Sequence, residues 1–282
     1  MATASSVRRA VEDHYTRLTA QQKRTADYLL SHHRTAFSLS VNELARQAGV
    51  SEATVVRFAR EIGYAGYQEM RSALMDEVKR DLTPEDRFAV ERPPSDPGDT
   101  VARVADSEVE NITRTVAELD SKEFRRFVAR VRKARHVATM GLGASSMLAR
   151  FAQYLLFQIG VRAHYLSRDA LTLAEQVAIL PQRSILWVFS FPPYSKQTVE
   201  ATTRASEQNI PILAIIDSVR SPLHPFASAT LHACSDNVLF TNAMSSAMVL
   251  INAVVTDLAL SDKTRALDQL RASIRASHNE YV

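Results

Sequence analysis

Two different hydrophobic patterns divide the chain. From residue 7 to residue 75, apolar residues recur at steps of three and four, which is the spacing of one buried helix face. After residue 135 the pattern changes to short apolar runs separated by segments with helical spacing. The sequence therefore predicts a mainly α N-terminal part followed by an α/β part.

The N-terminal part is predicted to contain one long helix followed by several short ones. Apolar spacing predicts a helix over residues 7–33, with a break expected near residues 19–22. Between residues 41 and 75, helical segments follow one another closely and are punctuated by glycines. We expect these segments to fold as a small helical domain.

The α/β part is predicted to be a parallel sheet flanked by helices. Short apolar strands that alternate with longer helices are typical of a parallel sheet covered on both faces. The predicted strands are residues 136–140, 161–166, 185–190, 211–216 and 229–233. The predicted helices are residues 145–159, 170–180 and 195–208 between strands, 101–119 and 122–132 before them, and 243–260 and 263–277 after them.

A linker is expected between the two parts. Residues 82–100 contain four prolines and many charged residues, so this stretch can neither continue a helix nor build a core. We therefore predict a helical domain at residues 1–81, a linker at 82–100, and an α/β domain at 101–282.

Composition narrows the protein class. Of the 282 residues, 46% are hydrophobic and 23% are charged, which excludes collagen-like, low-complexity and wholly disordered chains. The net charge is +3, and residues 1–80 alone carry 12 Lys and Arg against 9 Asp and Glu. This excess permits a polyanionic partner of the N-terminal part without demanding one.

The sequence favours the cytoplasm. Cys234 is the single cysteine and cannot form an internal disulfide, and residues 1–20 carry charges where a secretory signal would be apolar. The longest apolar stretch, residues 247–260, is interrupted by polar residues and is shorter than the roughly 20 residues that cross a bilayer. We expect no membrane segment.

Residues 41–63, VNELARQAGVSEATVVRFAREIG, have the pattern of two helices joined by a short turn. Gly49 supplies the positive φ that ends the first helix, and Ser51 can cap the second. On the second helix, one face is apolar at steps of 100° and contains Val55, Phe58, Ala59 and Ile62. The segment therefore predicts a helix-turn-helix.

The opposite face of the second helix is predicted to bind double-stranded DNA. It offers a small residue, a hydroxyl and two guanidinium groups, which suit a helix in the major groove. The candidate DNA-binding residues are Ser51, Ala53, Thr54, Arg57 and Arg60. The alternative is that these are the ordinary surface arginines of a helical hairpin.

A longer match favours the DNA-binding alternative. Continued into Gly63-Tyr64-Ala65-Gly66-Tyr67, the segment resembles the N-terminal domain of the RpiR/MurR family of bacterial transcriptional regulators. The resemblance implies a regulator that binds operator DNA, with Tyr64 and Tyr67 as core supports rather than DNA contacts.

A candidate anion site follows the first predicted strand. Residues 141–146, Gly-Leu-Gly-Ala-Ser-Ser, lead directly into a helix, and glycines, hydroxyls and free amides at a helix start favour a phosphate. A dinucleotide fold would place a third glycine where Ser146 stands and an acidic residue after the second strand. We therefore expect no nicotinamide and no other cofactor.

Ser145 and Ser146 are what the sugar isomerase (SIS) domain shows at this loop, and the RpiR/MurR family joins that domain to its helix-turn-helix. The resemblance implies a second loop, here residues 190–195, in which Ser190 matches and Ser195 replaces a threonine. Pro192 and Pro193 stand where the family has a serine and a glycine, and they remove donors that a phosphate would use. The candidate ligand-binding residues are Gly143, Ser145, Ser146, Ser190, Ser195 and Lys196.

Three interpretations of the α/β domain remain open on the sequence alone. It binds a sugar phosphate or a related acidic metabolite, it has lost its ligand and only dimerises, or the chain is a sugar phosphate isomerase with an accessory helical domain. An isomerase needs a general base, and nothing in the spacing of Glu175, Glu200 or His164 nominates one. We expect no catalytic residue and no metal ligand set.

The interpretation that we adopt is a cytoplasmic transcriptional regulator. Its effector would change how two or more copies pack and so alter binding to a two-fold symmetric operator. We expect a homodimer or homotetramer, with the apolar helix at residues 243–260 contributing to the interface.

Overall fold

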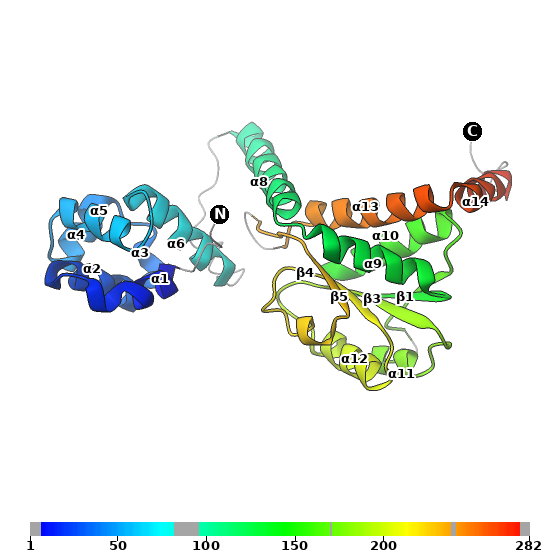
Figure 1. Cartoon of the computed structure of the whole chain (residues 1–282). Coiled ribbons are helices and arrows are strands. Elements are labelled where there is room, and N and C mark those ends of the chain that lie inside the picture. Colours follow the sequence, from blue (N-terminus) through cyan, green and yellow to red (C-terminus); the bar gives the residue numbers. More distant parts are fainter. Residues whose placement is uncertain (1–6, 82–95, 170, 238–240, 277–282) are drawn as a thin grey trace. The chain divides into compact units, whose positions relative to one another are not determined.

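The computed structural model describes residues 7–81, 96–169, 171–237 and 241–276 (Figure 1). The chain divides into two compact units, Met1–Arg92 and Pro93–Val282, which we call the N-terminal and the C-terminal unit. The division falls within the predicted linker, of which residues 82–95 lie outside the described residues.

The N-terminal unit is helical. Its elements are α1 (Val7–His14), a 3-10 turn (Tyr15–Arg17), α2 (Ala20–Ser31), α3 (His33–Ala36), α4 (Val41–Ala48), α5 (Glu52–Glu61) and α6 (Tyr67–Asp81). The prediction of one helix over residues 7–33 is wrong, whereas the break expected near residue 19 is present. Thr19 and Gln22 form a reciprocal capping box there, so α2 starts afresh.

The helices of the N-terminal unit enclose one hydrophobic core. Leu44, Phe58 and Met70 from α4, α5 and α6 are completely buried in it. Because α5 contributes its whole apolar face to this core, the opposite face of the same helix is left for solvent or a partner.

The C-terminal unit has the predicted α/β pattern. Its helices are α8 (Pro97–Ala117), α9 (Ser121–Lys133), α10 (Ala144–Gln158), α11 (Leu173–Ala178), α12 (Lys196–Glu207), α13 (Ser245–Ser261) and α14 (Lys263–Ala276). Its strands are β1 (His136–Met140), β2 (Ala163–Tyr165), β3 (Ser184–Ser190), β4 (Ile212–Ile216) and β5 (Ala229–His232). Helix α8 begins at Pro97, earlier than predicted, because Asp96 caps its first turn.

The five strands form one parallel sheet in the order β2-β1-β3-β4-β5. Met140 at the end of β1 pairs with Val188, and Ser190 at the end of β3 pairs with Ile216. The strand order reverses direction between β1 and β3, which places a topological switch point at their carboxyl ends.

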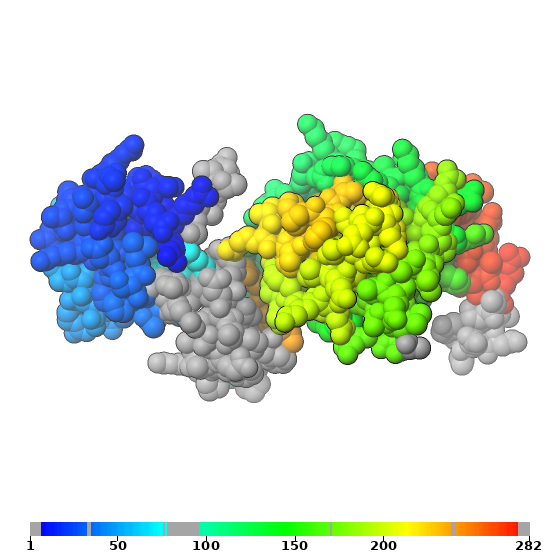
Figure 2. All heavy atoms as spheres, turned by 90° about the horizontal axis from the view of Figure 1, so that it is seen from below, coloured from blue at the N-terminus to red at the C-terminus, as the bar shows by residue number. Residues whose placement is uncertain are grey.

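Helices cover both faces of this sheet (Figure 1). Along β3, Trp187 and Phe189 pack with α9, α10 and α13, whereas Leu186 and Val188 pack with α11 and α12. Figure 2 views the unit from the α11 and α12 side, where yellow and yellow-green side chains hide the sheet.

Helix α13 is apolar because it packs in the core of the C-terminal unit. Seven of its residues are buried, and all of them except Ser246 belong to the core on the α9 and α10 side of the sheet. Met248 and Leu260 are its large hydrophobic residues that remain exposed. The composition that led us to predict an interface helix is therefore the composition of a core helix.

Among the described residues, no single helix is both long enough and apolar enough to span a membrane. Within the described part of the chain, the pair α13 and α14 meets both criteria when the two helices are taken together, and their axes are bent by 107°.

Candidate functional site

The helix-turn-helix is built by local capping signals. Ser40 and Glu43 form a capping box that starts α4, and hydrogen bonds from Ser40 hold the pKa of the Glu43 carboxyl below its usual range. Gly49 ends α4 with φ +64°, and Ser51 Oγ accepts a hydrogen bond from Thr54 N to start α5. The turn therefore lies where the sequence predicts it.

The outer face of α5 presents Ala53, Arg57 and Arg60 to solvent, as predicted. Ser51 is exposed as well and serves as the cap of the helix. The guanidinium of Arg57 makes no hydrogen bond or ion pair with any described residue, so it is available to a partner. Arg60 is partly committed, because its Nε donates to Ala65 O at 3.2 Å.

The prediction that Thr54 belongs to the outer face of α5 is wrong. Its side chain is 7% exposed, and its hydroxyl lies 2.9 Å from Ser51 Oγ. The 100° rule placed it beside Arg57, but Thr54 lies in the first turn, where the side chain closes the cap rather than facing outward. We therefore leave Thr54 out of the proposed contact surface.

Residues after α5 fix that helix to the rest of the unit. Tyr67 is buried and donates from its hydroxyl to Leu39 O at 2.8 Å, as expected of a core support. Arg71 Nε donates to Phe37 O at 2.8 Å. These bonds hold α6 against the segment before α4, so the outer face of α5 is presented by a rigid support.

The second candidate site lies at the carboxyl edge of the sheet. We call residues 141–146 the first serine loop and residues 190–196 the second serine loop. They follow the adjacent strands β1 and β3 and lead into α10 and α12, which cover opposite faces of the sheet. Loops that part in this way at a switch point leave the crevice where open α/β sheets bind ligands.

The first serine loop depends on Gly141. A Cβ at this position would lie 2.4 Å from the carbonyl oxygen of Ser145, so only glycine lets β1 come this close to the first turn of α10. Gly143 has φ +58° and is the N-cap residue of α10, and no side chain caps this helix. The N-terminus of α10 is therefore left without a side-chain acceptor for its N–H groups.

The hydroxyls of the two serines in the first loop differ in their hydrogen bonding. Ser146 Oγ donates to Gly143 O at 2.7 Å. Ser145 is only 6% exposed, and its hydroxyl has no hydrogen-bond partner among the described residues. Because its hydroxyl has no partner in the described part of the chain, Ser145 is the serine of this loop that is free to donate to a ligand.

The second serine loop repeats this contrast. Ser190 is 4% exposed, and its hydroxyl is likewise unpartnered among the described residues. Ser195 caps α12, with its Oγ accepting from Thr198 N at 3.5 Å, and Lys196 is exposed. The sequence therefore located the loops correctly but could not separate the two unpartnered serines from the two with structural tasks.

Two partners of the second loop are not foreseeable from the sequence. Tyr194 donates to both carboxylate oxygens of Asp217, at 2.8 and 2.9 Å, and Asn242 Nδ2 donates to Pro192 O. Burial and the Asp217 carboxylate raise the pKa of Tyr194 far above its usual value, so its hydroxyl stays protonated and remains a donor. The members of each pair are far apart in the sequence, so no local motif predicts their contact.

Cavities of about 420 and 380 Å³ open beside the two edge strands. The first is lined by residues of β2 and just after it, such as His164 and Leu166, and the second by β5 residues such as Thr230 and His232, so neither involves the four serines. The described residues contain no group of three or more His, Cys, Asp or Glu placed to hold a metal ion.

Comparison with known families finds two matches. Residues 6–81 match the helix-turn-helix domain of the rpiR family, and residues 130–257 match the SIS domain. A helix-turn-helix (HTH)-type transcriptional regulator of Haemophilus influenzae is 29% identical over 233 residues, which are 82% of this chain and 81% of that protein. One of Bacillus subtilis is 25% identical over 269 residues, covering 92% of this chain and 94% of that protein.

Solved structures share the fold. The Vibrio vulnificus NanR protein complexed with ManNAc-6P aligns with a TM-score of 0.61 at 24% identity, over 98% of this chain and 99% of that one. The sugar isomerase domain of an RpiR transcription factor from Sphaerobacter thermophilus aligns with a TM-score of 0.60 at 26% identity, over 62% of this chain and 97% of that one.

Proposed function

This protein is an HTH-type transcriptional regulator that joins an rpiR-family helix-turn-helix domain to a SIS domain, and we propose that a small phosphorylated sugar bound at its two serine loops changes its affinity for operator DNA. The α5 face with Ser51, Ala53, Arg57 and Arg60 would contact the DNA. The protein would act in the cytoplasm, where that DNA is.

The observation that carries this proposal is the pair of unpartnered serine hydroxyls at the switch point. The residues Ser145, in the first turn of α10, and Ser190, at the end of β3, are both more than nine-tenths buried, and both lie at the carboxyl edge of the adjacent strands β1 and β3. The uncapped start of α10 adds backbone N–H donors and the positive end of a helix dipole. Hydroxyls and amides around a helix start are donors suited to a phosphate or carboxylate group.

A phosphorylated sugar is favoured among anions for two reasons. The NanR protein with the same fold is complexed with ManNAc-6P, a compound of this class. Lys196 also extends from the second loop as an exposed positive charge, which offsets part of what Pro192 and Pro193 remove. The prolines nonetheless leave fewer donors, so we expect weaker capture of the phosphate than a serine-glycine loop would give.

We propose that the chain is not an isomerase. Glu175 is held in a capping box by Thr172, and hydrogen bonds from that residue lower the pKa of the carboxyl, so it is poorly suited as a general base. Glu200 is exposed on α12, and His164, on the edge strand β2, lines a cavity to which none of the four serines contributes.

Three measurements test the function. Genomic fragments enriched by the purified protein would supply its operator, and retardation of that operator would then be compared with and without each member of a sugar phosphate panel that includes ManNAc-6P. Calorimetry with the same panel would measure binding itself. Retardation that no member alters, together with no heat of binding, would support a domain that only dimerises. Turnover of any member in a coupled isomerase assay would support the enzyme.

Replacing Arg57 with alanine is expected to weaken operator binding by about 1 to 3 kcal/mol, which is about fivefold to 150-fold in affinity. The guanidinium has no partner among the described residues, so its removal should leave the fold of α5 intact. Retardation titrations against the operator would measure the change. Arg17→Ala, which removes the same charge from an exposed position before α2, is the matched control. Equal losses in the two variants would mean that Arg57 contributes only general charge.

Ser145→Ala is expected to weaken sugar phosphate binding by about tenfold to a hundredfold, because a hydrogen bond to a charged group is lost. Ser146→Ala is the matched control, since its hydroxyl already bonds to Gly143 O and should matter less. Calorimetric titration of both variants with the tightest-binding member of the panel gives the comparison. A larger loss in Ser146→Ala would reverse the roles that we assign to the two serines.

We propose that the protein binds its operator as a homodimer or homotetramer. A helix-turn-helix dimer reads two half-sites, so a symmetric operator requires paired domains. Light scattering during size-exclusion chromatography would give the number of copies.

A further inference from the structure

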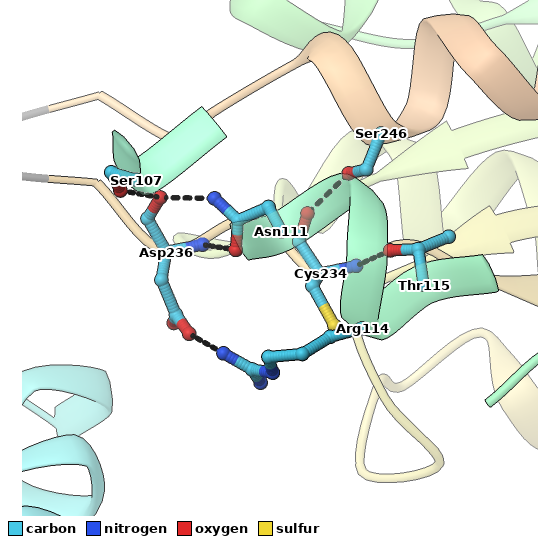
Figure 3. Close-up of polar contacts among 7 residues, drawn as sticks. All are labelled: Ser107, Asn111, Arg114, Thr115, Cys234, Asp236 and Ser246. Atoms are coloured by element: carbon cyan, nitrogen blue, oxygen red, sulfur yellow. Dashed lines mark hydrogen bonds and ion pairs between the residues drawn. The ribbon is translucent and has the colours of Figure 1, made fainter. Parts of the chain in front are cut away.

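The segment after β5 is pinned to helix α8 by a network of polar contacts (Figure 3). Arg114 Nη1 lies 2.7 Å from Asp236 Oδ2, and Thr115 Oγ1 accepts from Cys234 N at 2.9 Å. Ser107 Oγ adds a longer bond of 3.4 Å to Asp236 O. Together with Asn111, these side chains lie on successive turns of one helix and hold a stretch of three residues, Cys234–Asp236, which we call the pinned segment.

Asn111 is the centre of this network. Its Nδ2 donates to Asp236 O at 2.7 Å, and its Oδ1 accepts from Asp236 N at 3.2 Å, so one amide side chain pairs with both main-chain groups of one residue (Figure 3). The side chain is 1% exposed. Separating it from Asp236 without a replacement would leave buried polar groups unpaired, so α8 and the pinned segment must move together or part completely.

The same segment connects to the second serine loop. Ala243 N donates to Ser235 O at 3.1 Å, and the neighbouring residue Asn242 donates through Nδ2 to Pro192 O. Ser246 at the start of α13 donates to Cys234 O. Contacts therefore run from Pro192 through Asn242 and Ala243 to the pinned segment, and from there to Asn111 and Arg114 on α8.

Helix α8 is the first helix of the C-terminal unit, and it follows the linker from the helix-turn-helix. Its residues 98–106 are all exposed, and its contacts with the pinned segment begin at Ser107. One half of the helix is thus anchored at the carboxyl edge of the sheet, while the other half leads back toward the DNA-binding domain along the chain. A change at the anchor would be carried along a rigid helix.

We infer that Asn242, the pinned segment and the polar face of α8 form a relay that passes the state of the second serine loop to the chain leading to the helix-turn-helix. This inference rests on the proposed function for its purpose, since a ligand at the serine loops is what would displace Pro192. The contacts that form the relay are present in the structure whether or not a ligand binds. It assigns to Asn242 and Asn111 a positioning role, without contact of either with ligand or DNA.

Hydrogen–deuterium exchange of the full chain tests the relay without ligand or DNA, so its outcome is independent of the proposed function. Asn242→Ala removes the bond to Pro192 O, and amide exchange is followed in peptides from the second serine loop, the pinned segment and residues 107–117 of α8. We expect exchange to be faster by about threefold or more in all three, because loss of an anchor raises local opening. Gln197→Ala, which removes an exposed carboxamide with no bond to a described residue, should leave all three unchanged.

The reverse direction provides a second test, because coupling between two sites is reciprocal. Asp236→Asn weakens the contact with Arg114, and Glu110→Gln neutralises an exposed carboxylate of the same helix as its control. The relay requires that Asp236→Asn speed up amide exchange in the second serine loop and that Glu110→Gln leave that exchange unchanged. Faster exchange confined to the mutated end in either variant, or no change at either end, overturns the relay even if sugar phosphates bind and alter operator affinity.

Discussion

Replacing Phe58 with alanine is expected to unfold the N-terminal unit while the C-terminal unit stays folded. Phe58 is completely buried in the core that α5 shares with α4 and α6, and truncation of a buried phenylalanine costs about 3 to 5 kcal/mol. A domain of this size has a total stability of about 5 kcal/mol, so most of it would be lost. Operator binding should disappear with the fold.

The chain offers a specific readout for this prediction. Its single tryptophan, Trp187, is fully buried in β3, so tryptophan fluorescence reports the C-terminal unit alone, whereas far-ultraviolet circular dichroism reports both units. In urea, Phe58→Ala should lower the first circular dichroism transition and leave the fluorescence midpoint unchanged. Glu61→Ala, at an exposed position on the same helix, should change little. A fluorescence midpoint that falls together with the dichroism would show that the two units do not unfold independently.

Replacing Gly141 with alanine is expected to destabilise the C-terminal unit by about 3 kcal/mol and to abolish measurable sugar phosphate binding. The added Cβ would lie 2.4 Å from Ser145 O and 2.7 Å from Ser145 C, which are main-chain atoms that cannot rotate away. Helix α10 would have to shift, and with it the hydroxyl of Ser145 and the free N–H groups at the helix start. Both losses therefore have one geometric cause.

The fluorescence midpoint of Trp187 in urea measures the stability loss, and calorimetry with the sugar phosphate panel measures the binding loss. Gly98→Ala is the control in the same unit, because its Cβ would make only ordinary contacts from 3.6 Å and its φ is not positive. The assignment of Gly141 as the residue of close approach fails if both glycine variants keep the midpoint of the unaltered protein.

The sequence located most elements because their signals are local. Strand β1 lies at the predicted residues 136–140, and α14 lies within one residue of its prediction, since an apolar run or a helical stripe is visible in a short window. The helix-turn-helix was equally visible, because Gly49 and Ser51 act on their immediate neighbours. The error at residues 7–33 arose where a continuous apolar stripe concealed a capping box at Thr19.

The hydrogen-bond partners of individual side chains were harder to predict from the sequence. Ser145 and Ser146 are identical in chemistry and adjacent, yet one hydroxyl is unpartnered and the other bonds to Gly143 O. Thr54 closes a cap although helical periodicity places it on the outer face. Such distinctions depend on which atoms lie within hydrogen-bond distance, and periodicity carries no information on that.

The sequence by itself determined the two-part organisation, the element types, the helix-turn-helix and the position of both serine loops, because capping, turn formation and apolar periodicity act over a few residues. Only the tertiary structure decided the strand order, the contact of Gly141 with Ser145, and the pairing of Asn111 with Asp236 across 125 positions. Those features arise when distant segments pack and bury polar groups, and each buried group must then find a partner that the local sequence does not contain.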